Sequence, residues 1–189
     1  LLNLVQRSIE VMSELRYRNA GTLEFLFCYG EFFFLEVNTR LQVEHPVSEF
    51  VSGQDIVAAQ IAIADEGVLP FQQSQVSLSG SSIECRILAE SSDGKPSPGL
   101  ITNLRLPGGP GVRIDSHAYV GYEVPHQYDS LLAKLIVYGQ NRSEALAKMR
   151  FALTEMKIDG IQTNIELLLR IISDPDFSQV RFDTSWKPQ

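Results

Sequence analysis

The sequence is poor in cysteine and in basic residues, and it has no long apolar run. Only two cysteines occur in 189 residues, Cys28 and Cys85, each inside an apolar stretch, so neither a disulfide framework nor a cysteine metal cluster is expected. The 16 basic residues against 23 acidic ones argue against a nucleic-acid surface. Without a leader or an apolar run near the ~20 residues of a membrane helix, we expect a cytoplasmic protein that does not bind membranes.

The hydrophobic fraction of 44% is enough for a buried core, in one large or two small domains. Residues 69–82 are polar and irregular, so we expect one domain at residues 1–75 and a second at residues 76–189. Leu1 already lies in a helical pattern, and we interpret the chain as a fragment of a longer protein.

Helical and strand patterns in the first domain indicate an α+β fold. A helical apolar repeat ends at residues 19–21, and TLEFLF and EFFFLEVN then predict a hairpin around a Tyr-Gly pair. Ser52 and Asp55 predict the start of a helix that runs to about Asp65. Because that helix is apolar nearly all round, we expect it to be buried.

The second domain is predicted to be an antiparallel sheet with helices. In SIECRILAE, alternation directs Arg86 away from the face of Cys85 and Ile87. Further strands are predicted at residues 101–106, 112–117 and 131–138. A helix follows and stops at residues 159–160, and a Thr163/Glu166 capping box predicts a last helix.

Two carboxylates lie within the apolar hairpin strands. Burying an unpaired carboxylate costs several kcal/mol, so Glu24 and Glu36 each need a cation or a ligand. A two-residue turn would place the two acids on opposite faces, whereas a three-residue turn ending in a left-handed Gly30 would place them diagonally on one face. We favour the three-residue turn because it separates a core face from the acids, with Phe33 and Leu35 on the core face.

On one face, the two acids and Asn38 would offer hard oxygen ligands to a magnesium or manganese ion bound with a nucleotide. The alternative from these residues alone is that each glutamate pairs with an arginine or a lysine.

A row of polar residues follows directly. If the backbone stays extended past Val37, alternation places a set of polar side chains on one side: Glu36, Asn38, Arg40, Gln42 and Glu44. Arg40 could bind an anion or neutralise a neighbouring glutamate. For His45 we prefer a hydrogen bond that fixes the loop over a catalytic role.

The run FLEVNTRLQVEHPVSE, at residues 34–49, resembles the signature of biotin carboxylase, an enzyme of the ATP-grasp family. The similarity continues in SSIECRILAE, KPSPGLI, YDSLLAKLIVYG and IDGIQTN, and so covers nearly the whole chain. The resemblance implies the C-terminal part of an ATP-grasp domain, with an antiparallel sheet and helices, followed by the biotin carboxylase C-terminal domain of the same type.

The resemblance also implies roles for individual residues. Glu24, Glu36 and Asn38 would hold Mg²⁺ or Mn²⁺ at the ATP phosphates, with Leu26 and Leu35 on the adenine side. Arg40, Gln42 and the backbone of Val43 would bind bicarbonate, and Glu44 would deprotonate it. Arg86 would stabilise the enolate of biotin, although an isolated strand arginine is more often a surface residue.

The implied activity is the ATP- and bicarbonate-dependent carboxylation of biotin on a carrier protein or domain. A carboxyltransferase, a homodimer in the intact enzyme, and a place in acetyl-CoA carboxylase and fatty acid biosynthesis are expected with it. The glycine-rich phosphate loop and the nucleotide-binding lysines of the family do not occur here, so we expect the fragment alone to be inactive. A non-catalytic module that keeps the pocket wall, or another ATP-grasp carboxylate-amine ligase, are the alternatives.

Overall fold

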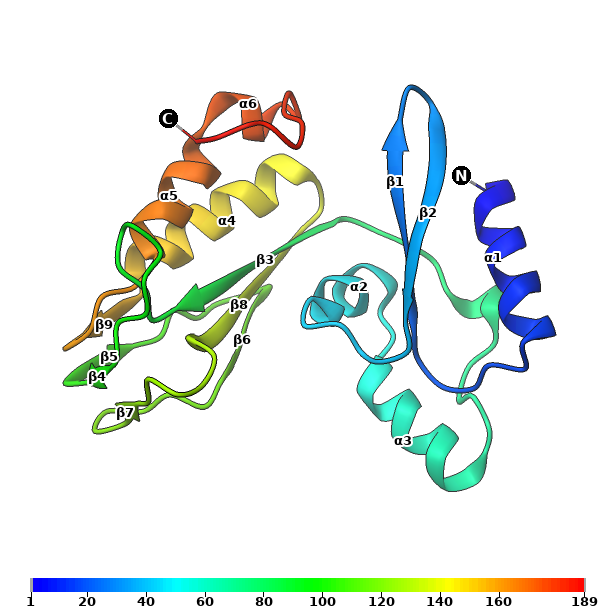
Figure 1. The fold of residues 1–189 in the computed structure, drawn as a ribbon, viewed down its shortest axis with the longest axis horizontal. Coiled ribbons are helices and arrows are strands. Elements are labelled where there is room, and N and C mark those ends of the chain that lie inside the picture. Colours follow the sequence, from blue (N-terminus) through cyan, green and yellow to red (C-terminus); the bar gives the residue numbers. More distant parts are fainter. Residues whose placement is uncertain (1, 189) are drawn as a thin grey trace. The chain divides into compact units, whose positions relative to one another are not determined.

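The structure is a computed structural model that describes residues 2–188, and it confirms an α+β fold (Figure 1). The chain divides into two compact units. The first contains the residues up to His45 and then Ser52–Ser77, and the second contains Pro46–Val51 and the residues from Leu78 onward. None of the helices among residues 2–188 is long and apolar enough to span a membrane.

The first unit consists of helices around one hairpin. Its elements are α1 (Leu2–Glu14), β1 (Thr22–Cys28), β2 (Glu31–Asn38), α3 (Ile56–Glu66) and the short 3-10 helix η1 (Gln73–Gln75). The expected end of α1 at residues 19–21 is wrong by about a turn. The helix ends at Glu14, and the backbone takes left-handed φ values at Arg16 and Asn19.

The hairpin turn differs from the favoured prediction. Cys28 pairs with Glu31, so the loop contains only Tyr29 and Gly30, with φ values of 50° and 84°. Two positive φ values in a two-residue loop match the right-handed twist of the flanking strands. The predicted three-residue turn is therefore wrong, because Cys28 belongs to the paired strand and not to the loop.

The helical region after the hairpin also differs from the prediction. A helix not expected from the sequence, α2, spans His45–Ser52. The next helix, α3, begins at Ile56, where the Asp55 carboxylate accepts a hydrogen bond from the Ala58 amide at 2.7 Å. Asp55 is therefore the N-cap, and Ser52 is not. The expected burial of α3 is wrong as well, because Ala59 is its only buried residue and Ile61 is 65% exposed.

The second unit is built on an antiparallel sheet, as predicted, but the sheet has three strands, and the strand expected at residues 101–106 is not one of them. The sheet has the order β3 (Ser81–Leu88), β8 (Leu131–Gly139), β6 (Val112–Ser116), and Figure 1 shows α4 (Arg142–Glu155) and α5 (Ile165–Ser173) together on one side of it. Two smaller antiparallel pairs flank it, β4 (Gly99–Leu100) with β7 (Glu123–Val124) and β5 (Asn103–Arg105) with β9 (Lys157–Asp159). A short helix, α6 (Pro175–Ser178), follows α5.

The core of this unit lies between β8 and α4. Leu135 and Val137 of β8 and Met149 of α4 are completely buried, as is Ile87 of β3. Full burial of one such side chain contributes about 1.5–3 kcal/mol. The N-cap of α4 is Asn141, whose side chain accepts a hydrogen bond from the Glu144 amide at 3.0 Å.

The last long helix does not start with the predicted capping box. Its N-cap is Asn164 rather than Thr163, and the Asn164 side chain makes no capping hydrogen bond to α5. That side chain bonds to the backbone of β3 instead. The expected stop before Pro175 is correct, because α5 ends at Ser173.

Candidate functional site

The two hairpin carboxylates lie directly opposite each other. The pairing from the turn runs regularly to Phe25 with Phe34, and then the register shifts so that Glu24 pairs with Glu36. Leu35 is the extra residue of this β-bulge. The predicted common face of the two acids is confirmed, but a bulge produces it instead of a longer turn, and the acids are direct rather than diagonal neighbours.

Two side-chain amides converge on these carboxylates. Asn38 Nδ2 donates to Glu24 Oε1 at 2.7 Å and to Glu36 Oε1 at 3.2 Å, and Gln42 Nε2 donates to Glu24 Oε1 at 3.0 Å. One nitrogen therefore bridges an oxygen of each acid. Hydrogen bonds to charged groups contribute about 1.5–3 kcal/mol each, so the amides offset the repulsion between two facing carboxylates.

The donor chemistry of this cluster fits a magnesium-like ion. Two carboxylates and the amide oxygen of Asn38 are hard oxygen ligands, and the Asn38 contacts show that both carboxylates reach a common point. Among residues 2–188 there is no group of three or more His, Cys, Asp or Glu side chains that could hold a metal. Mg²⁺ is usually bound through one or two carboxylates and takes its remaining ligands from phosphates and water, and two carboxylates are present here.

The opposite face of the hairpin is apolar. Phe25 packs edge to face against Phe34, and Phe27 packs against Phe32. Together with α1, this face surrounds an apolar pocket of about 450 Å³. The expected core-face positions of Phe33 and Leu35 are wrong, because Phe33 pairs with Leu26 on the acid side and Leu35 is the bulge residue. Both are about half exposed.

The polar row does not continue as an extended strand. The strand ends at Asn38, Arg40 lies in a bend, and Val43 and Glu44 form a turn before α2. The strict alternation predicted from residue 36 to residue 44 is therefore wrong after Asn38. Gln42 nevertheless reaches Glu24 by its side chain.

The loop that carries this row is fixed by local hydrogen bonds. The Arg40 guanidinium donates to the carbonyl of Leu41 at 3.1 Å. His45 Nδ1 lies 2.8 Å from the carbonyl oxygen of Gln42, which also accepts the His45 amide at 3.3 Å. The hydrogen bond expected of His45 within this loop is present. Arg40 and Glu44 are both exposed to solvent.

Arg86 lies on the sheet of the second unit, on the predicted face. Its side chain is exposed, whereas those of Cys85 and Ile87 are buried toward the helices. The register places Lys134 of β8 opposite Arg86, and Asp115 of β6 opposite Lys134. A charged row therefore crosses this face of the sheet.

The charged row ends in a tight ion-pair group that the sequence analysis missed. Arg113 donates to Asp115 at 2.8 Å and to Glu49 of α2 at 2.7 Å, and Lys134 lies 3.3 Å from Asp115. Burial pushes the pKa of Asp115 upward, but hydrogen bonds and charge from Arg113 and Lys134 bring that pKa below its usual value. The alternation of Arg113 and Asp115 on one strand face was the available signal.

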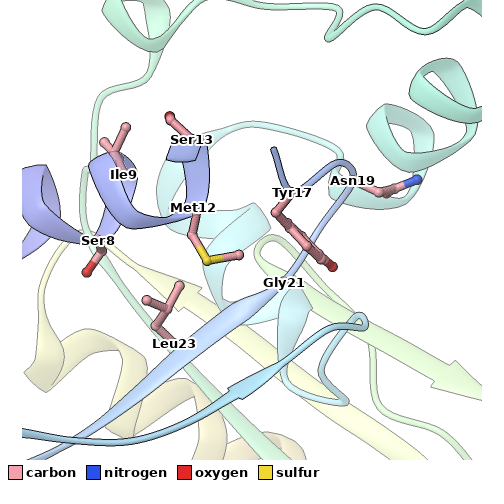
Figure 2. A pocket seen from close by; sticks show the side chains of 8 residues that line it. All are labelled: Ser8, Ile9, Met12, Ser13, Tyr17, Asn19, Gly21 and Leu23. Carbon is pink, nitrogen blue, oxygen red and sulfur yellow. The ribbon is translucent and has the colours of Figure 1, made fainter. Parts of the chain in front are cut away.

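A second pocket of the first unit lies away from the acids. It has a volume of about 310 Å³, and Figure 2 shows Met12 of α1 and Leu23 of β1 pointing toward one another across it. Tyr17 also lines the pocket, and its hydroxyl donates to the carbonyl of Ala20 at 2.7 Å. The pocket is lined by Ser8, Ile9, Met12, Ser13, Tyr17, Asn19, Gly21 and Leu23. This lining contains no carboxylate, and none of its residues is a site residue predicted from the sequence.

Comparison with known proteins shows which family this chain resembles along its length. Residues 84–188 match the family "Biotin carboxylase C-terminal domain", and residues 2–71 match "Carbamoyl-phosphate synthase L chain, ATP binding domain". The biotin carboxylase of Pseudomonas aeruginosa is 51% identical over 174 residues, which cover 90% of this chain and 38% of that protein. A pyruvate carboxylase subunit from Methanothermobacter thermautotrophicus is 45% identical over 179 residues, covering 94% and 36%.

Solved structures agree with the sequence comparison. The biotin carboxylase domain dimer of Hydrogenobacter thermophilus 2-oxoglutarate carboxylase, in complex with MgADP and bicarbonate, superposes with a TM-score of 0.91 at 43% identity, covering 94% of this chain and 40% of that chain. The biotin carboxylase of Campylobacter jejuni gives 0.91 at 46% identity, covering 95% and 40%. The chain spans less than half of each relative, and it belongs to the biotin carboxylase family.

Proposed function

We propose that this chain forms one wall of the active site of a biotin carboxylase, which carboxylates biotin at the expense of ATP and bicarbonate. The observation that carries the proposal is the direct pairing of Glu24 with Glu36, with Asn38 bridging both acids. Membership of the family supports it, as do relatives solved with MgADP and bicarbonate.

The carboxylate cluster would hold the divalent ion of the nucleotide. Glu24, Glu36 and Asn38 supply the oxygen ligands, and Mg²⁺ or Mn²⁺ would neutralise charge that develops on the ATP phosphates. Leu26 lies on the acid face of the hairpin, consistent with contact to the adenine. The half-exposed bulge residue Leu35 is the second apolar candidate.

The loop after β2 would bind and activate bicarbonate. The guanidinium of Arg40 offers a planar anion two parallel hydrogen bonds, and Gln42 and the Val43 backbone add neutral contacts. Glu44 would remove the proton from bicarbonate, a role that contributes about 10²- to 10⁴-fold. The deprotonated anion attacks the γ-phosphorus of ATP and displaces ADP, and the resulting carboxyphosphate decomposes to carbon dioxide and phosphate.

Arg86 would act on biotin itself. When phosphate takes the ureido proton, negative charge develops on the ureido oxygen of biotin. A fixed guanidinium near that oxygen lowers the barrier, because it is oriented before the charge appears. The exposed position of Arg86 on a rigid strand suits this role.

The parent protein would supply the rest of the enzyme. We assign residues 1–75 to the ATP-grasp domain and residues 76–189 to the biotin carboxylase C-terminal domain, which is supported by the change of compact unit after Ser77. A biotin carrier, a carboxyltransferase and a homodimer would complete the assembly. We favour acetyl-CoA carboxylase as that assembly, and relatives from pyruvate and 2-oxoglutarate carboxylases are the competing possibilities.

The test uses the full-length parent protein and two isosteric variants. Glu36→Gln should weaken Mg²⁺-dependent ATP binding, because it removes charge from the ion cluster. Glu44→Gln should leave nucleotide affinity within about twofold and lower bicarbonate-dependent turnover by about 10²-fold or more. Nucleotide titration and steady-state kinetics measure the two effects separately.

Glu31→Gln is the matched control, since Glu31 lies on the same hairpin but beside the turn. Its kinetics should equal those of the wild type. Equal losses of binding and turnover in Glu44→Gln would instead make Glu44 a structural or metal residue. The isolated 189-residue chain should show no biotin-dependent ATP turnover.

A further inference from the structure

We infer that Asn164 is a positioning residue for Arg86, holding the strand segment that carries this arginine from the outer edge of the sheet. The inference rests on the proposed function of Arg86 and adds a residue to it. Asn164 contacts the backbone on both sides of Ile87. Its Nδ2 donates to the carbonyl of Arg86 at 3.0 Å, and its Oδ1 accepts the amide of Leu88 at 2.9 Å.

The contacts lie along the outer edge of the sheet. In the order β3-β8-β6, β3 is an edge strand, so the side of its backbone that faces away from β8 is not part of the sheet's ladder. The side-chain amide of Asn164 takes the place of a neighbouring strand there, with one donor and one acceptor. The Asn164 backbone amide adds a third contact, to the carbonyl of Leu88 at 3.2 Å.

The ladder on the inner side is interrupted at the same place. Ile87 pairs with Ala133 but Leu88 pairs with Leu131, so Leu132 is an extra residue in β8. A bulge disrupts the ladder and bends the strand locally. Past the bulge, the Ala89 amide donates to the carbonyl of Ser130 at 2.8 Å on the inner side, and Asn164 holds the outward-facing groups of Arg86 and Leu88 on the other side.

The helix α5, whose N-cap is Asn164, lacks a stabilising side-chain contact because of this arrangement. Asparagine is among the best N-cap residues, because its side-chain oxygen accepts an amide of the first helical turn. At the start of α5 this capping hydrogen bond is not made. The Oδ1 atom bonds to Leu88 instead, so the amide group is directed to the strand.

This arrangement fixes the base of the Arg86 side chain. The buried neighbours Cys85 and Ile87 hold one face of the strand in the core, and Asn164 holds the peptide groups that follow Arg86. The direction of the Cα–Cβ bond of Arg86 is thereby set. Because electrostatic stabilisation depends on charge oriented in advance, a loose strand end would weaken the contact with the biotin enolate but leave the activation of bicarbonate intact.

The test compares two reactions of the full-length parent protein. Under the proposed function, ATP hydrolysis with bicarbonate but without biotin would require the residues of the first unit, whereas carboxylation of free biotin would also require Arg86. Asn164→Ala should lower kcat for biotin carboxylation on the order of 10- to 100-fold. It should change bicarbonate-dependent hydrolysis by less than about twofold. Asn141→Ala is the matched control, because it removes the side-chain N-cap of α4 and no contact to β3.

A second variant, Asn164→Asp, should show a pH dependence of the carboxylation rate that a purely structural role of Asn164 would not produce. In Asn164→Asp the carboxylate still accepts the Leu88 amide but cannot donate to the Arg86 carbonyl, and protonation restores that donor. The carboxylation rate of this variant relative to the wild type should therefore rise as the pH falls, whereas the ratio for Asn164→Ala stays flat. Amide exchange at Leu88 should be faster than in the wild type for Asn164→Ala and unchanged for Asn141→Ala.

The possible failures are distinct. If the wild type does not carboxylate biotin, the proposed function is wrong and this role is lost with it. If the wild type is active but Asn164→Ala slows both reactions equally, Asn164 is only structural. If amide hydrogen exchange at Leu88 is the same in Asn164→Ala as in the wild type, Asn164 does not hold the end of β3, whatever the activity of the variant.

Discussion

At the residue scale, the site depends on a few polar atoms with more than one contact. Asn38 serves two carboxylates with one nitrogen, and Glu24 Oε1 accepts two amides. Asn164 likewise serves a donor and an acceptor on one strand. Asn38 lies where a cation could lie between two acids, and Asn164 bonds the strand backbone where a neighbouring strand could bond it.

Cys85 is a residue whose ionisation the fold resists. Burial, and to a smaller extent the charge of Glu84, raises the pKa of its thiol from 9.0 to about 12. A raised pKa means that the contribution to stability is complete below pH 9 and is lost as the pH rises toward 12. Relative to Cys85→Ala, the free energy of unfolding of the wild type should fall by about 1.4 kcal/mol per pH unit above pH 9. Denaturant titrations of both proteins at several pH values measure this slope. If the free energy of unfolding changes with pH equally in the wild type and in Cys85→Ala, the prediction is wrong.

At the element scale, the hairpin combines a tight turn with a bulge. The turn requires left-handed backbone at Tyr29, a fully exposed side chain with φ of 50°. The left-handed conformation costs most residues roughly 1–2 kcal/mol, whereas asparagine tolerates it better. The hairpin therefore carries a strained residue at its tip for which packing gives no compensation.

Replacing that residue should stabilise the hairpin. Tyr29→Asn creates the Asn-Gly pair that two-residue hairpin turns favour, and should stabilise the first unit by several tenths to about 1 kcal/mol. Amide exchange along β1 and β2 measures the gain. Tyr128→Asn is the control, since Tyr128 is exposed but is not among the residues with positive φ. Equal effects of the two changes would show that the loss of an exposed aromatic ring, and not turn geometry, is responsible.

The same elements show what sequence reasoning reaches and where it stops. The strands, the antiparallel sheet and the faces of Arg86 and Glu24 follow from alternation, which is a local property. The bulge at Leu35 and the helix at His45–Ser52 do not, because in both segments the backbone departs from the regular strand geometry that alternation assumes. The role of Asn164 depends on a strand 76 residues away, which local spacing cannot reveal.

At the scale of the whole molecule, burial is divided unequally between the two units. Among residues 2–188, Ala59 is the one buried apolar residue of the first unit, and the other buried apolar residues belong to the second. The first unit also exposes Leu15, Phe27 and Phe34 by more than half. Exposed apolar surfaces of this kind promote association with other protein surfaces.

This division predicts two unfolding steps for the isolated chain. The first unit should lose structure at lower denaturant, because little apolar area stabilises it, and the second should follow in a separate transition. Amides of β1 and β2 should exchange much faster than those of β8. Coincident transitions for probes in the two units would show that the chain unfolds as one cooperative body instead.

The bulge at Leu35 also changes how spacing in such hairpins is to be understood. A regular hairpin with a two-residue turn pairs positions whose separation is odd, as for residues 28 and 31. Glu24 and Glu36 are separated by an even number of positions and still face each other. Parity therefore carries structural information: when facing residues around a two-residue turn have an even separation, one strand must contain an extra residue. A deletion of Leu35 would keep the two acids paired and remove the irregularity, whereas a deletion within β1 between Glu24 and the turn would not.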